Sequence, residues 1–218
     1  MLSSTFEQAN RAGLAWDIRV DPKESQTLIF AYPSVIAGDD GYVRRVVKIE
    51  MGAKAAFDPH QAMTIRPFVA DDVEGIPLDV AGVATIRPER TFWDKALFAH
   101  ELRARFDADG DLPAAGQRLT RHYYDLHRMM EREEGPRAIA DRALGAACLG
   151  HRLVFFPGRK EQRATGQPGE YRLVPRGGMV QLLRKDYVRM TGMVFGQASG
   201  FDEVVASIEE IERQLNTE

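Results

Sequence analysis

The stretch RLTRHYYDLHRMMERE, residues 118–133, is the clearest helix pattern in the chain. Its apolar and aromatic side chains recur at three- and four-residue spacing, so they form one stripe along a helix: Leu119, His122, Tyr123, Leu126, Met129 and Met130. The pair Gly135-Pro136 is expected to end this helix. Before it, Pro88 and Glu89 suit the first turn of a helix running to about Phe106. Further helices are expected over residues 137–149, 179–195 and 202–215.

The part of the chain before Pro88 has the pattern of strands. Residues 26–32 form a strand candidate with Leu28, Phe30 and Tyr32 on one face, and residues 42–51 form a second, longer candidate after the turn sequence GDDG. Shorter strands are expected over 63–69 and 80–86. Strands come first and helices follow, which is typical of the α+β class. We therefore expect a sheet region over residues 1–87 and a helical region over 88–218, packed together as one compact unit.

The composition is that of an ordinary globular protein, with 218 residues, 44% hydrophobic and 28% charged. No apolar run approaches the roughly 20 residues that a membrane span needs. The N-terminus lacks the basic start and apolar stretch of a signal peptide. Cys148 is the only cysteine, so no intramolecular disulfide can form, and its apolar neighbours predict a buried side chain. We therefore expect a cytoplasmic protein.

The net charge of −3 is unevenly distributed along the chain. Residues 151–190 contain nine Lys/Arg and three Asp/Glu, a net of +6, so the remainder sums to −9. A basic stretch on an acidic protein predicts a partner that carries phosphates, such as RNA. The alternative is a solvated, arginine-rich face with no partner.

Several common chemical motifs are absent from the sequence. The segment DADGD, residues 107–111, begins like a calcium loop, but Leu112 and Arg118 stand where that loop needs glycine and glutamate. The five histidines show no zinc-like pairing with each other or with Cys148. There is no glycine-rich phosphate loop and no G-x-S-x-G.

The remaining candidates are charged residues inside predicted strands and helices. Lys48 and Glu50 are two residues apart in a strand, so they lie on the same face of its sheet. Lys95 lies on a helix among apolar neighbours, and Asp125 lies one turn after Arg121. Each has a plain alternative: a surface carboxylate for Glu50, a lysine reaching out to solvent for Lys95. An Arg121–Asp125 ion pair would contribute only about a few tenths of a kcal/mol, since it runs from base to acid.

Taken together, these residues belong to sequence segments that resemble a known family. The segments VKIE (47–50), PERTFWDKALFAH (88–100) and RHYYDL (121–126) occur in the order and at roughly the spacing found in the AbiEii/AbiGii toxin family of nucleotidyltransferases. The segments KDYVRMTGMVFG (185–196) and FDEVVASIEEIERQLN (201–216) are similar to its C-terminal region. The resemblance implies a polymerase-β-like mixed sheet followed by a helical region. It also implies transfer of a nucleotide from an NTP, with Mg²⁺, to an acceptor such as tRNA, and control by an antitoxin.

The resemblance also assigns roles to individual residues. Lys48 and Glu50 match the family's Lys-x-Asp/Glu motif, Lys95 matches its helical lysine, and Asp125 matches the aspartate of its next motif. It follows that Glu50, Lys95 and Asp125 are the expected catalytic residues, and that Glu50 is the expected metal ligand. Lys48 and Arg121 are the expected substrate-binding residues. We expect Glu50, Lys95 and Asp125 to converge on one cleft.

One departure from the family pattern is serious. The family opens with a Gly-Ser-type segment followed by Asp-x-Asp, and those two carboxylates hold the metal ions. Nothing here matches that opening: Asp17 and Asp21 are four residues apart and have no Gly-Ser segment before them. We therefore expect this chain to be N-terminally short relative to the family, and incomplete or inactive as a transferase. The alternatives are a non-catalytic RNA- or protein-binding module on the same fold, or a helical DNA-binding regulator, for which no basic recognition helix is evident.

Overall fold

A computed structural model describes residues 17–32, 46–52, 56–113, 118–156, 158 and 163–217. The chain divides into two compact units, residues 1–55 and 56–218. Among the described residues all α-helices begin at or after Pro88 and all strands end by Ile86, which confirms the α+β class. The packing of a 1–87 region against an 88–218 region stays a prediction.

The first unit contains a three-stranded sheet in the order β1-β2-β3, formed by Asp17–Val20, Thr27–Ala31 and Val46–Glu50. Both strand pairs are antiparallel. Leu28 pairs with Ile49 and Phe30 pairs with Val47, so these apolar side chains share one face of the sheet. The two strands predicted in this region are therefore present as β2 and β3. Within the described residues, β3 begins at Val46.

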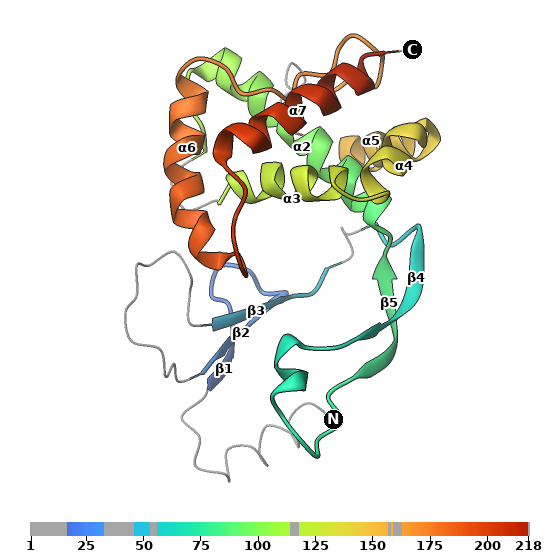
Figure 1. The fold of residues 1–218 in the computed structure, drawn as a ribbon, viewed down its shortest axis with the longest axis vertical. Helices are drawn as coiled ribbons and strands as arrows, with labels where there is room; N and C mark the ends of the chain where they lie inside the picture. The colour runs from blue at the N-terminus through green and yellow to red at the C-terminus, as the bar shows by residue number, and fades with distance from the viewer. Residues whose placement is uncertain are drawn as a thin grey trace. The chain divides into compact units, whose positions relative to one another are not determined.

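The second unit begins with a hairpin of two antiparallel strands, β4 (His60–Ile65) and β5 (Val80–Ile86), joined through the 3₁₀ helix η1 (Phe68–Asp71). The strand predicted over 63–69 lies earlier than expected, because Pro67 cannot donate to a strand ladder and instead precedes η1. Every strand pair among the described residues is antiparallel, so they show no parallel pairing of the kind that a mixed sheet contains. β5 leads directly into the first long helix (Figure 1).

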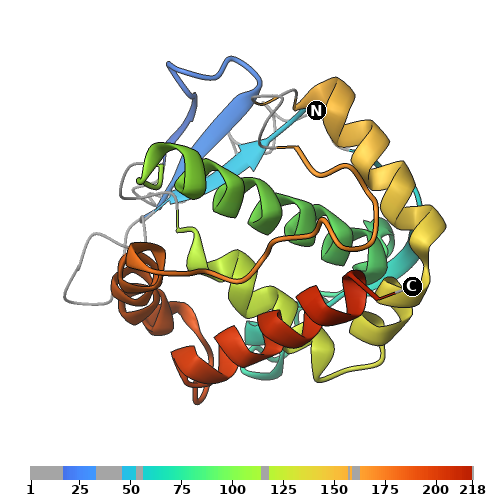
Figure 2. The same cartoon turned by 90° about the horizontal axis from the view of Figure 1, so that it is seen from above.

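Three of the other described helices of the second unit pack on α2 (Pro88–Asp109), and the remaining two pack mainly on one of those three. Figure 2 shows α2 between α5 (Arg142–Phe155) on one side and α3 (Thr120–Met130) and α7 (Phe201–Leu215) on the other. The set is completed by α4 (Glu134–Ala140), α6 (Gly178–Met190) and the 3₁₀ helix η3 (Thr191–Met193). No helix in the described part of the chain is long and apolar enough to cross a membrane.

The core lies between these helices and follows the predicted apolar stripes. Tyr123 and Leu126 of α3 are buried as expected, as is the α7 stripe, which consists of Val204, Ile208, Ile211 and Leu215. Trp93 of α2 is 1% exposed, and its indole Nε1 donates to the Ala138 carbonyl at 2.8 Å. Cys148 is also buried, as predicted, and burial raises the pKa of its thiol to about 12, so it is no nucleophile at neutral pH.

Three helix boundaries differ from the sequence prediction. Gly135-Pro136 does not end a helix but lies in the first turn of α4, where a proline without an N–H is tolerated. The helix expected over 137–149 is divided at Asp141, whose carboxylate accepts from the backbone N–H of Leu144 at 2.9 Å and so begins α5. The helix expected over 179–195 ends at Met190 and continues as η3.

Two glycines of α5 give a prediction about packing. A Cβ added at Gly145 would lie 2.6 Å from the Trp93 ring, whereas one at Gly150 would meet nothing within 4 Å. Alanine favours a helix over glycine by about 1 kcal/mol, but overpacking a core costs about 1–3 kcal/mol. Gly150→Ala should therefore raise the free energy of unfolding, and Gly145→Ala should lower it. Urea denaturation followed by circular dichroism measures both, and an equal effect of the two variants would contradict the close packing at Trp93.

Candidate functional site

Lys95 and Asp125 form an ion pair between two helices of the second unit. The Lys95 ammonium on α2 lies 2.5 Å from the Asp125 carboxylate on α3, although the residues are 30 apart in sequence. The Lys95 side chain is 18% exposed and that of Asp125 is 42% exposed. Arg121, one turn before Asp125, is exposed. In the described part of the chain Asp125 therefore pairs with Lys95 and not with Arg121.

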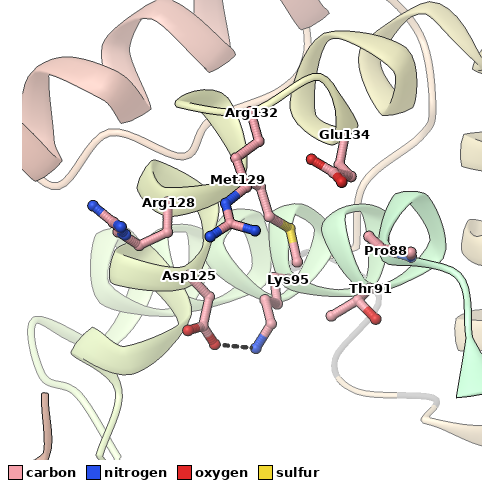
Figure 3. Close-up of a pocket in the computed structure, with 8 residues that line it drawn as sticks. All are labelled: Pro88, Thr91, Lys95, Asp125, Arg128, Met129, Arg132 and Glu134. Carbon is pink, nitrogen blue, oxygen red and sulfur yellow. Dashed lines mark hydrogen bonds and ion pairs between the residues drawn. The ribbon is translucent and has the colours of Figure 1, made fainter. Parts of the chain in front are cut away.

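The Lys95–Asp125 pair lies in the wall of a pocket of about 470 Å³, which is within the range of small-molecule sites. Figure 3 shows its lining, which comes from one side of α2 and from α3 with the residues that follow it. The lining residues are Pro88, Thr91, Lys95, Asp125, Arg128, Met129, Arg132 and Glu134. We call this cavity the Lys95 pocket. Arg121 is not among its lining residues.

The charges around the Lys95 pocket are unequal. Three cations and two carboxylates line it, which leaves one net positive charge. The guanidinium of Arg128 lies 2.5 Å from the Glu131 carboxylate, and Glu134 lies 3.9 Å from the guanidinium of Arg137. Arg132 forms no ion pair with any residue that the structure describes, and Figure 3 shows its guanidinium turned toward the Lys95–Asp125 pair. An anion is therefore the ligand that this lining favours.

His122 is a neutral residue that lies within the electrostatic influence of Lys95. Burial lowers the pKa of His122 to about 3, with a further contribution from the charges of Lys95, Arg121 and Arg152. The His122 ring packs on the Phe98 ring, with centroids 4.5 Å apart. His122 therefore fills space beside Lys95 and adds no charge to the site at neutral pH.

The basic stretch 151–190 lies partly in ion pairs of its own. Arg152 forms a two-pronged bond with Glu101, at 2.5 and 2.6 Å, and so joins α5 to α2. Arg184 pairs with Asp202 of α7 at 2.6 Å. Arg172, Arg176 and Lys185 are exposed, while Arg159 and Lys160 lie outside the described residues. An RNA-binding role for this stretch stays a prediction.

Lys48 and Glu50 lie in the first unit, on the same face of β3 as predicted. The Lys48 ammonium contacts the Glu50 carboxylate at 2.6 Å and the Glu24 carboxylate at 2.8 Å. These two carboxylates raise the pKa of Lys48 above its usual value, Glu24 having the larger effect. Whether Glu50 meets Lys95 and Asp125 in one cleft stays a prediction.

The described residues do not fit a magnesium site as they stand. Within them, no three His, Cys, Asp or Glu side chains gather as a metal ion requires. Glu50, the predicted metal ligand, has its carboxylate on the Lys48 ammonium, and a lysine cation competes with a metal for that oxygen. Two of the three acids of the DADGD segment are also engaged: Asp107 pairs with Arg103 and Asp109 with Arg105, in the last turns of α2.

The sequence alone did not identify the other charged residues of the Lys95 pocket. Arg128 and Arg132 follow Asp125 by three and seven residues, and Thr91 precedes Lys95 by four. This spacing places Arg128 and Thr91 on the same sides of α3 and α2 as the two predicted residues, so a helical wheel would have found them. Arg132 lies beyond the end of α3 at Met130, so a wheel includes it only if the helix runs to residue 133 as predicted. Glu134 carries no such signal, because it begins a different helix.

The chain matches the family model described as nucleotidyl transferase AbiEii toxin, type IV TA system, over residues 3–207. No curated protein and no solved structure matches it.

Proposed function

The chain belongs to the AbiEii family of nucleotidyl transferase toxins, which confirms the resemblance seen in its sequence, and we propose that it holds a nucleoside triphosphate in the Lys95 pocket for transfer to an acceptor such as tRNA. One observation carries the proposal. Lys95 and Asp125 come from two separate motifs of the resemblance, and they meet at 2.5 Å in the wall of a pocket that favours an anion.

The chemistry of the transfer explains why such a pair is useful. An acceptor hydroxyl attacks the α-phosphorus, a new P–O bond forms, the bond to the β-phosphate oxygen breaks, and pyrophosphate leaves while the hydroxyl proton passes to solvent. Negative charge grows on the departing pyrophosphate, so a positioned cation stabilises the transition state. Lys95 supplies that cation as a compact point charge. Asp125 orients the lysine through its ion pair.

Magnesium is the cofactor that the resemblance implies, and it stays part of the proposal. The transfer step uses only Lys95 and Asp125, because the described residues do not assemble a site for a metal ion. The tRNA acceptor, contacted by the basic stretch 151–190, is also proposed. So are a cytoplasmic location and an antitoxin partner, of which the last is suggested by the toxin-antitoxin description of the family.

The proposal predicts that this chain binds a nucleotide but transfers little of it to an acceptor. We expect at least one of ATP, GTP, CTP and UTP to bind saturably to the purified 218-residue protein. We expect little labelling of tRNA with Mg²⁺ and radiolabelled NTPs, because the sequence has no Gly-Ser-led Asp-x-Asp pair to hold the ions. Titration calorimetry measures the first and gel autoradiography the second.

The two outcomes test different parts of the proposal. If none of the four NTPs binds at low salt, the Lys95 pocket is not a nucleotide site. Robust labelling of tRNA would contradict the expected lack of activity, and would show that Asp17 or another acid replaces the missing pair.

A further inference from the structure

We propose that Arg132 binds the polyphosphate of the nucleotide together with Lys95, Arg132 acting as a two-pronged guanidinium and Lys95 as a point charge. The inference rests on the proposed function, because it names the group of the substrate that occupies the Lys95 pocket. No motif of the resemblance includes Arg132.

The pairing of the pocket arginines distinguishes Arg132 from its neighbour. Arg128 is held by Glu131 at 2.5 Å, so a ligand would have to compete with that carboxylate. Arg132 has no such partner within the described residues, and its guanidinium is turned toward Lys95 (Figure 3). Lys95 is neutralised by Asp125 and Arg128 by Glu131, so Arg132 carries the charge that an anion in the cavity would neutralise. Arg132 is therefore the pocket arginine whose donors are available to a ligand.

The geometry of the lining suits a polyphosphate better than a single carboxylate. A guanidinium matches the spacing of two phosphate oxygens, whereas an ammonium binds one oxygen without directional preference. Lys95 lies on α2 and Arg132 lies in the segment between α3 and α4, so each cation can hold a different phosphate of one polyphosphate. The pocket also borders the first turn of α2 at Pro88 and Thr91, where the positive end of a 22-residue helix adds to the attraction of an anion.

The experiment compares Arg132 variants with three probes: ATP, inorganic triphosphate and AMP. Arg132→Ala should weaken binding of inorganic triphosphate and of ATP about tenfold, and binding of AMP by less than twofold, because AMP lacks the β- and γ-phosphates. Arg132→Lys should restore part of the affinity, since it returns the charge but not the two-pronged geometry. Arg213→Ala is the matched control: Arg213 is exposed, pairs with Glu210 on α7 and does not line the pocket.

The result that would overturn the inference is triphosphate affinity unchanged in Arg132→Ala while ATP still binds the wild type. That result leaves the proposed function standing. Binding of inorganic triphosphate that depends on Arg132, with no NTP bound, would instead support the phosphate site and reject the nucleotide. If neither inorganic triphosphate nor any of the four NTPs binds the wild type, both proposals fail. Arg132 is exposed, so folding should survive, and circular dichroism of both variants checks it.

A phosphate in this pocket could also come from an RNA backbone. Competition by a short single-stranded RNA without a terminal triphosphate separates the two sources. We expect it to leave binding of inorganic triphosphate unchanged. If the RNA displaces the triphosphate in the wild type and not in Arg132→Lys, Arg132 serves the acceptor, and the inference is wrong.

Discussion

Replacing Lys95 by alanine is expected to lower the affinity of the chain for its NTP about tenfold to a hundredfold. A hydrogen bond to a charged group contributes about 1.5–3 kcal/mol, and each 1.4 kcal/mol is about a factor of ten in affinity. The substitution also leaves the Asp125 carboxylate in the pocket wall without its partner at 2.5 Å, and that carboxylate then repels phosphates. Titration calorimetry of the wild type and the variant with the same NTP measures the loss.

Two further variants separate charge from position. Lys95→Arg keeps the positive charge, so it should recover part of the affinity. Asp125→Asn removes the carboxylate but keeps its shape; if Asp125 only orients Lys95, the variant should bind the NTP with a smaller loss than Lys95→Ala. A folded Lys95→Ala protein that binds the NTP as well as the wild type would reject the Lys95 pocket as the nucleotide site.

The sequence could identify Lys95 and Asp125 but not their pairing. Helical periodicity gives the face on which a residue lies, and it places Arg121 and Asp125 one turn apart on the same helix. It does not give the neighbouring helix that packs against that face. The choice of Lys95 over Arg121 as the partner depends on how α2 and α3 pack, which is decided by core side chains elsewhere on both helices.

Arg132 illustrates a second limit of reasoning from sequence. The chain has 29 lysines and arginines, and most local contexts predict a solvated side chain for each of them. What sets Arg132 apart is a cavity beside it and the absence of an ion pair among the described residues, and both depend on tertiary structure. The Gly135-Pro136 pair shows the same limit for the backbone, because proline can mark either the end of one helix or the first turn of the next.

Trp93 was part of a family-like segment in the sequence, yet the structure gives it a role in stability. Its indole donates to the Ala138 carbonyl of α4 at 2.8 Å, and its ring lies against Gly145 of α5. The Tyr171 ring, on the segment between α5 and α6, has its centroid 6.2 Å from that of Trp93. The Trp93 side chain therefore contacts three other parts of the second unit. Trp93 precedes Lys95 by two residues in α2.

Trp93→Ala is expected to lower the free energy of unfolding by about 3–5 kcal/mol, the range for removing a fully buried aromatic ring. Domains of this size are stable by about 5–15 kcal/mol, so the variant should still fold but with a much lower urea midpoint. Trp93→Phe keeps an aromatic ring but loses the donor to Ala138 and the volume of one indole ring, so its loss should be smaller than that of Trp93→Ala, about 1–3 kcal/mol. Urea denaturation followed by circular dichroism measures both. A loss below 1 kcal/mol in Trp93→Ala would mean that α2, α4 and α5 do not depend on this ring, and that the core must be centred elsewhere.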